Sequence, residues 1–199
     1  MCKANLIYYF SPKLLMAIRI TISGEAGSGK STVADIIARK LRINRYSTGD
    51  YMRTMAAARG VTIIELNKIS ETDSSIDKEL DDWQKKLETK KDESLVLDSR
   101  LGFHFIQSSI KIFLHADLSV RAERIFTTNR LLEENTTLKK TIANIKKRQA
   151  LERKRYKEKY GVDYLDFSQY DLILDTTKIK PEEVADKIIM FVRNFFQNI

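Results

Sequence analysis

Apolar residues follow two different spacings along this chain, and the spacings predict strands separated by helices. Ile18, Ile20 and Ile22 alternate with polar residues, which is typical of a strand. Between residues 30 and 41 the apolar positions recur every three or four residues, as on the buried face of a helix. The same patterns predict strands at 43–46, 95–97, 110–114 and 172–174, and helices at 50–59, 62–69, 76–91, 118–127, 138–160 and 181–196.

Strands that alternate with helices favour a parallel sheet that is covered on both faces. The runs 95–97, 110–114 and 172–174 are almost wholly apolar, which indicates strands buried on both sides. We therefore predict an α/β fold of three layers, with five parallel strands between two layers of helices. Trp83 falls on the apolar stripe of helix 76–91 and is expected to pack in the core.

The length of 199 residues suits one α/β domain. We assign this domain to residues 16–199, and residues 1–15 to an N-terminal extension, because the first strand pattern begins directly after Met16. The chain has no uninterrupted apolar run of 18 residues, and its only cysteine is Cys2, so we predict a cytoplasmic protein without a membrane partner.

The net charge of +8 indicates anionic partners, either nucleic acid or small phosphorylated molecules. Many of the basic residues lie between positions 139 and 159, on one predicted helix. A solvated helical face would also explain this concentration, so charge alone does not choose between the two kinds of partner.

Residues 24–31 read G-E-A-G-S-G-K-S, which matches the phosphate-binding pattern G-x-x-x-x-G-K-[ST] between a predicted strand and a predicted helix. The glycines let consecutive backbone N–H groups face a phosphate, and the helix adds its dipole. Lys30 is expected to span the β- and γ-phosphates of ATP, and Ser31 to bind Mg²⁺. The predicted ATP site comprises Gly24, Gly27, Ser28, Gly29, Lys30, Ser31 and Thr32.

This loop alone is compatible with an ATPase, a GTPase or a kinase. The chain lacks the N-K-x-D and D-x-x-G motifs of a GTPase in a plausible place, and it is small for a helicase or a transport motor. Phosphoryl transfer to a small acceptor is therefore the favoured reaction.

The run S-T-G-D-Y-M-R at residues 47–53 resembles the S-[TA]-G-D-x-x-R segment of the short cytidylate kinases, which are P-loop nucleoside-monophosphate kinases. The resemblance implies that Arg53 holds the α-phosphate of the acceptor, with Thr48, Gly49 and Asp50 beside it. A guanidinium group suits this role because it can donate two parallel hydrogen bonds to a phosphate.

Asp98, Ser99 and Arg100 resemble the D/E-G-R segment of the same family, with serine at the position of the glycine. The resemblance implies that Asp98 and Arg100 face the acceptor, Asp98 near its base or the water shell of Mg²⁺, and Arg100 on its base and phosphate. Alternatively, Asp98 is an acid that only orients Mg²⁺.

Arg148, Glu152 and Arg155 are spaced by four and three residues, which places them within an arc of roughly 60° on one helix. They resemble the R-x-x-x-[DE]-x-x-R pattern of cytidylate kinases. This implies that both arginines reach the transferring phosphates and that Glu152 binds the acceptor and reaches its ribose. Arg124 lies in a segment that resembles the helix leading into the family's lid, where it would contact the donor phosphates, and Arg130 is a second candidate.

The predicted function is transfer of the γ-phosphate of ATP to CMP or dCMP by a monomeric enzyme with Mg²⁺ as cofactor. Lys30, Arg124, Arg148 and Arg155 are the expected catalytic residues. The resemblance places the acceptor-binding segment at about 48–92 and a helical lid at about 124–155.

Two alternatives stay open. One is a P-loop kinase for another nucleoside monophosphate, such as AMP or UMP, or for a small metabolite such as shikimate. The other is a nucleic-acid-associated ATP-binding protein whose helix 138–160 follows phosphates. We expect no nucleic-acid partner, because that alternative leaves Arg53, Arg100 and the 148/152/155 face without roles.

Overall fold

The computed structural model describes residues 17–70, 72–127 and 137–197. The predicted extension 1–15 and the candidate Arg130 lie outside these ranges. Within them, parallel strands form one sheet in the order β2-β3-β1-β4-β5, which confirms the predicted five-stranded parallel sheet. The strands are β1 (Arg19–Gly24), β2 (Asn44–Ser47), β3 (Leu95–Asp98), β4 (Ile110–His115) and β5 (Leu172–Asp175).

Helices occupy every segment where helical spacing predicts them. Local signals set their ends: the Thr62 side chain begins one helix in a reciprocal capping pair with Glu65, and Gly161 ends another in the left-handed conformation. The long helices are α1 (Lys30–Leu41), α2 (Thr48–Ala58), α4 (Ser74–Thr89), α6 (Leu118–Thr127), α7 (Leu138–Tyr160) and α8 (Pro181–Gln197). Shorter ones are α3 (Ile63–Ile69), the unpredicted α5 (Gly102–Phe105) and a 3₁₀ turn at Phe167–Gln169.

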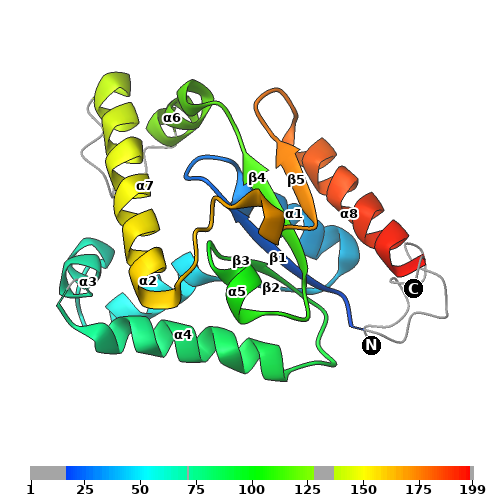
Figure 1. Cartoon of the computed structure of the whole chain (residues 1–199), viewed down its shortest axis with the longest axis horizontal. Coiled ribbons are helices and arrows are strands. Elements are labelled where there is room, and N and C mark those ends of the chain that lie inside the picture. The colour runs from blue at the N-terminus through cyan, green and yellow to red at the C-terminus, as the bar shows by residue number, and fades with distance from the viewer. Residues whose placement is uncertain (1–16, 71, 128–136, 198–199) are drawn as a thin grey trace.

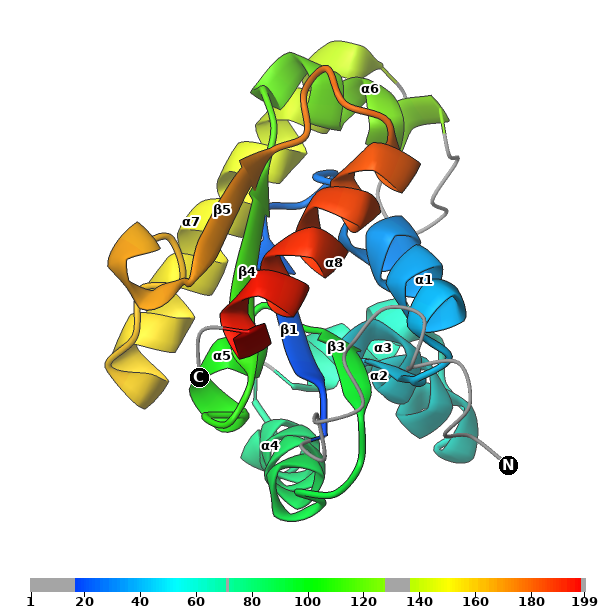
Figure 2. The same cartoon turned by 90° about the vertical axis from the view of Figure 1, so that its right-hand side faces the viewer.

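The two faces of β1 pack against different layers (Figures 1 and 2). Ile20 and Ile22 join a core cluster with α1 and α8, which cover one face of the sheet. Thr21 points to the opposite face, where α5 comes so close that a Cβ on Gly102 would lie 3.2 Å from the Thr21 side chain. A second, aromatic cluster fills that face beneath α7 and includes Phe113. This confirms the three-layer prediction.

The topology brings the predicted chemistry to one edge of the sheet. Ile22 of β1 and Ser47 of β2 are both in register with Asp98 of β3. Because parallel strands end at the same edge, the loop after Gly24, the side chain of Asp98 and the start of α2 meet there. In the ranges that the structure describes, none of the helices combines the length and apolar character that a membrane span requires.

Candidate active site

The loop between β1 and α1 depends on glycine at two points of close approach. Gly24 has a φ of 144°, and a Cβ there would lie 2.1 Å from the carbonyl oxygen of Leu114. Gly27 has a φ of 81°, and a Cβ there would lie 2.6 Å from the carbonyl oxygen of Arg121. A side chain would therefore collide with backbone at both positions. Gly29 ends the loop at a φ of 93°, just before α1 begins.

Lys30 folds back over the loop, where its ammonium group donates hydrogen bonds to the carbonyl oxygens of Gly24 at 2.9 Å and Glu25 at 2.7 Å. Burial, and then repulsion from Arg100, lower the pKa of Lys30 from 10.5 to about 7, while Asp98 and Glu152 oppose the shift. The lysine of the phosphate loop therefore lies within electrostatic reach of residues that the sequence assigns to the acceptor.

Ser31 and Asp98 form the candidate metal site. The Ser31 hydroxyl donates a hydrogen bond to Oδ2 of Asp98 at 2.6 Å, and Asp98 is only 7% exposed. Hydroxyl and carboxylate oxygens are ligands that Mg²⁺ accepts, either directly or through its bound waters, so this pair fits the predicted cofactor. Of the other predicted loop residues, Ser28 is buried and its carbonyl accepts a hydrogen bond from Thr176 at 2.9 Å, whereas the Thr32 side chain is exposed.

Two arginines of α6 support the phosphate loop from behind. Arg124 donates to the carbonyl oxygens of Thr176 at 2.7 Å and Gly27 at 3.4 Å. Arg121 is 5% exposed and contacts the carboxylate of Glu25 at 3.1 Å. Arg121 was not among the predicted site residues, although a signal exists: it interrupts the apolar stripe of α6 at a position that should be buried.

Arg53 lies on α2 with 57% of its side chain exposed, and it forms an ion pair with Asp50 one turn earlier. A Cβ on Gly49 would lie 3.8 Å from its guanidinium nitrogens, so glycine leaves the space in front of this group open. Burial alone would raise the pKa of Asp50, but hydrogen bonds from Arg45 and Arg53 lower it. The predicted phosphate clamp is therefore balanced by an ionised carboxylate.

Arg45 of β2 is a residue that the sequence analysis missed. Its guanidinium contacts Asp35 at 2.7 Å and Asp50 at 2.6 Å, and it lies 4.0 Å from Oδ2 of Asp98. It thus connects the acid of the candidate metal site with the acid that holds Arg53. Its strand is only weakly signalled in the sequence, and no local pattern shows that three acids from separate elements converge on it.

Arg100, Glu152 and Arg148 form a cluster that joins the end of β3 to α7. The Glu152 carboxylate lies 2.9 Å from Nε of Arg100 and accepts a hydrogen bond from Arg148 at 2.9 Å. Burial favours the neutral acid, yet Arg100 and then Arg148 lower the pKa of Glu152. Despite its own burial, Arg100 has a raised pKa because of Glu152, so all three groups are charged.

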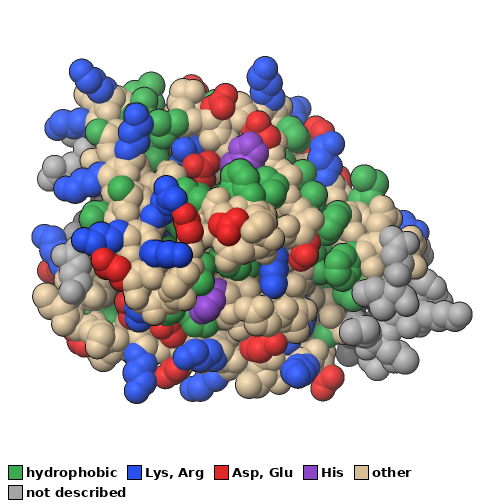
Figure 3. Space-filling model, in the orientation of Figure 1, with side chains coloured by type: hydrophobic (Ala, Val, Ile, Leu, Met, Phe, Trp, Pro, Cys, Tyr) green, Lys and Arg blue, Asp and Glu red, His purple; other side chains and the backbone are tan. Residues whose placement is uncertain are grey.

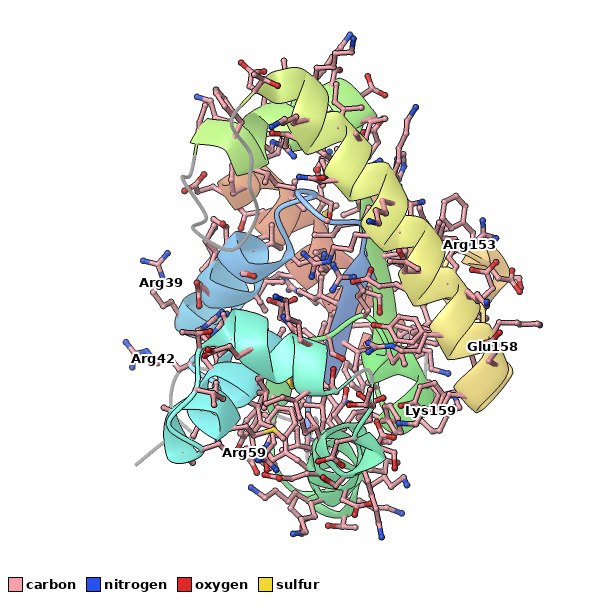
Figure 4. The ribbon with its side chains drawn as sticks, turned by 90° about the vertical axis from the view of Figure 1, so that its left-hand side faces the viewer. Arg39, Arg42, Arg59, Arg153, Glu158 and Lys159 are labelled. Carbon is pink, nitrogen blue, oxygen red and sulfur yellow. The ribbon has the colours of Figure 1, made fainter. Side chains whose placement is uncertain are left out.

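Arg155 contacts a different partner from its two predicted companions. Its guanidinium lies 3.9 Å from Asp77 of α4, and the other oxygen of Asp77 accepts a hydrogen bond from Lys159 at 3.0 Å. Figure 4 shows Lys159 on the end of α7 near α4, whereas Arg153 points outward. The structure therefore brings Arg148 and Glu152 to Arg100, and directs Arg155 toward Asp77 of α4.

Basic side chains line the surface along α7, as Figure 3 shows, but several of them have acidic partners. Arg153 pairs with Asp163, and Lys159 with Asp77. A cavity of about 310 Å³ lies between α2 and α4, and none of the predicted site residues lines it. Trp83 borders this cavity, stacked on Tyr51 with ring centres 4.4 Å apart, and packs only partly into the core that was predicted for it.

A parallel sheet with a glycine loop, its lysine and serine, and a facing carboxylate define the chain as a P-loop kinase. The model of the cytidylate kinase-like family matches residues 19–178, and the chain belongs to this family.

Curated relatives agree with this assignment, and a solved structure shares the fold. A curated cytidylate kinase of Sulfolobus acidocaldarius is 39% identical over 175 residues, which cover 86% of this chain and 92% of that protein. One of Natronomonas pharaonis is 42% identical over 83% of this chain and 84% of its own. A shikimate kinase structure from Acinetobacter baumannii has a TM-score of 0.60 at 17% identity, covers 88% of this chain and 93% of its own, and shows the shared fold. The chain is an ATP-dependent nucleoside-monophosphate kinase.

Proposed function

We propose that the enzyme transfers the γ-phosphate of ATP to CMP or dCMP, giving ADP and CDP or dCDP. One observation carries this proposal: Asp98, whose carboxylate accepts a hydrogen bond from Ser31 of the phosphate loop, stands two residues before Arg100, which pairs with Glu152 of α7. The residues expected to hold the donor phosphates and Mg²⁺ therefore adjoin the residues expected to hold the acceptor. Such proximity is what a direct transfer between two bound nucleotides requires.

On the donor side, backbone N–H groups of the phosphate loop would bind the phosphates of ATP, and Lys30 would exchange its two carbonyl partners for phosphate oxygens. Arg124 would add positive charge behind the loop. Ser31 would hold Mg²⁺ directly and Asp98 through water. When bound, Mg²⁺ supplies positive charge to the β- and γ-phosphate oxygens.

On the acceptor side, Arg53 would release Asp50 and bind the α-phosphate in the open space beside Gly49. Arg148 and Arg155 would neutralise charge on the transferring group, with Arg100 beside them, and Glu152 would bind the ribose. Thr48 would bind the acceptor beside Arg53, and its hydroxyl donates a hydrogen bond to the carbonyl oxygen of Asp98 at 3.4 Å.

In the chemical step, an oxygen of the acceptor phosphate forms a bond to the γ-phosphorus. The bond from that phosphorus to the β,γ-bridging oxygen breaks, and ADP leaves with the electron pair. No general base is needed, because the attacking oxygen is already anionic at pH 7. Catalysis then depends on positioning and on positive charge around the transferred group, and closure of the 124–155 lid would exclude water.

A coupled assay of ADP formation tests the proposal with CMP, dCMP, UMP, AMP and shikimate as separate acceptors. We expect kcat/KM for CMP or dCMP to exceed that for every other acceptor by at least about tenfold. A preference for UMP, AMP or shikimate would refute the cytidylate assignment while leaving a P-loop kinase. ADP formation that needs no acceptor would argue against a kinase altogether.

A further inference from the structure

One row of polar side chains on α4 faces the interior of the protein. Asp77, Asp81, Gln84 and Glu88 are spaced by four, three and four residues, so they lie on one side of the helix. Asp81 accepts a hydrogen bond from Tyr160 of α7, and Glu88 forms an ion pair with Arg19 of β1, while Asp77 binds Lys159. The row therefore runs from α7 toward the sheet, and Gln84 lies between its two ends.

Gln84 is 2% exposed, and its side-chain oxygen accepts a hydrogen bond from the Ser99 hydroxyl at 2.7 Å. This bond leaves the amide nitrogen as the free end of the side chain. Among the residues that the structure describes, that nitrogen has no hydrogen-bond partner. The nitrogen is not fully enclosed by protein atoms, so it can donate hydrogen bonds to a bound ligand or to water.

The neighbours of Ser99 place this amide on the acceptor side of the site. Asp98 pairs with Ser31 of the phosphate loop, and Arg100 pairs with Glu152 of α7. Ser99 itself is held from behind, because its carbonyl oxygen accepts a hydrogen bond from Ser23 at 3.1 Å. Gln84 is therefore held by Ser99, the residue that separates Asp98 of the candidate metal site from Arg100 of the cluster assigned to the acceptor nucleotide.

We propose that Gln84 is a specificity-determining residue that recognises the acceptor base by donating an amide N–H to N3 of cytosine. The inference rests on the proposed cytidylate kinase activity. Cytosine presents N3 as an acceptor on its Watson–Crick edge, and one N–H of the amide can donate to it. Uracil carries a hydrogen on N3, so its N–H would face the N–H of Gln84, and the two donors would repel.

A 3-deaza analogue of CMP tests this contact directly, because a C–H group replaces N3 and leaves the shape of the base unchanged. For the wild-type enzyme, we expect kcat/KM for CMP to exceed that for 3-deaza-CMP and for UMP by at least about tenfold. Gln84→Met keeps the length of the side chain but removes both donors. In this variant we expect the preference for CMP over either analogue to fall to about threefold or less, mainly through a higher KM for CMP.

Lys85→Met is the matched control, since it makes the same replacement on an exposed position of the same helix, and it should keep the wild-type preference. Ser99→Ala removes the hydroxyl that orients the amide, and we expect it to reduce the preference about two- to fivefold. If Gln84→Met fails to fold by circular dichroism, Ser99→Ala decides the question with the same analogues.

Two results would overturn the inference in distinguishable ways. If the wild type phosphorylates CMP but treats 3-deaza-CMP equally, or if the deciding variant keeps the full preference, Gln84 does not contact N3. If the wild type does not phosphorylate CMP, the proposed function fails, and this inference fails with it.

Discussion

The donor and acceptor halves of the site are held together by different kinds of contact. Around the phosphate loop, backbone packs on backbone: Gly24 lies against Leu114, and Gly27 against Arg121. On the acceptor side, ion pairs join separate elements, as between Arg45 and Asp50. Close-packed backbone has one arrangement, whereas a paired side chain can exchange its partner for a ligand. We therefore expect a preformed donor half, and a proposed acceptor half in which the substrate replaces the acids that pair with its arginines.

The largest effect is expected on the donor side. Lys30→Met should lower kcat by at least about 1,000-fold, because the loop loses the only side chain placed to neutralise the transferring phosphate from within it. The measurement is steady-state ADP formation with saturating ATP and CMP. Lys40→Met is the control, since Lys40 lies near the other end of α1 and pairs with Asp186. A Lys30→Met enzyme within tenfold of wild type would contradict the donor assignment.

Arg53→Ala tests the acceptor side alone. We expect kcat/KM for the monophosphate to fall about 100- to 1,000-fold, because the clamp for its phosphate is removed, while the Kd for ATP stays unchanged. Calorimetry gives the Kd, and the coupled assay gives the kinetics. Arg59→Ala, just after the end of α2, removes an arginine that pairs with Glu79 and should be nearly silent. An equal loss in ATP binding would mean that the two halves are not separable.

The same contrast explains what the sequence could predict. The donor loop is eight consecutive residues, and its glycines, lysine and serine have roles that follow from local backbone geometry. Strand and helix positions were likewise predicted, because period-two and helical spacings are local signals; only short elements such as α5 escaped. The structure confirms the five-stranded parallel sheet that these local signals predicted.

The acceptor half could be predicted only in part. Helical spacing placed Arg148 beside Glu152, but it could not show that Arg155 pairs with Asp77, because these two residues lie 78 positions apart in the chain, on different helices. Arg45 and Gln84 carry no motif, and their importance comes from partners that lie on other elements. When the role of a side chain depends on partners far away in the chain, no motif or regular spacing in the sequence indicates that role.

Arg45→Gln should have an intermediate effect on kcat/KM. Arg45 lies near both Asp98 of the candidate metal site and Asp50 on the acceptor side, so this variant tests the contact between the two halves. Without Arg45, Asp50 would bind Arg53 more tightly, so the clamp would be less available, and we expect kcat/KM for the monophosphate to fall about tenfold. Adding Asp50→Asn should recover part of this loss, because it weakens the competing pair. The coupled assay on both single variants and the double variant measures this. Strictly additive losses would rule out the competition.

The smallest predicted effect is the uptake of a proton by Lys30 when ATP binds. The pKa of Lys30 is lowered to about 7 in the free enzyme, so at pH 8 this amine is mostly neutral. Bound phosphate raises its pKa, so binding of ATP at pH 8 should take up a proton, to a fraction below one. Calorimetry in buffers of different ionisation enthalpy measures the uptake. It should disappear in Lys30→Met and decline toward pH 6, where the amine is already charged; uptake that is equal at pH 6 and pH 8 would contradict the shift.

The order of the strands also affects how this enzyme is made. β1 is the first strand of the sheet to leave the ribosome, but its partners are β3 and β4. Arg19 therefore cannot pair with Leu95, nor Ile20 with Ile110, until those later strands have been synthesised. The hydrogen bond from Thr176 to the carbonyl oxygen of Ser28 spans 148 residues. Contacts between such distant residues form late and slow the folding of a domain. The phosphate loop is thus among the first parts to be synthesised and among the last to be completed, so a nascent chain acquires its nucleotide site only when most of the sheet has formed.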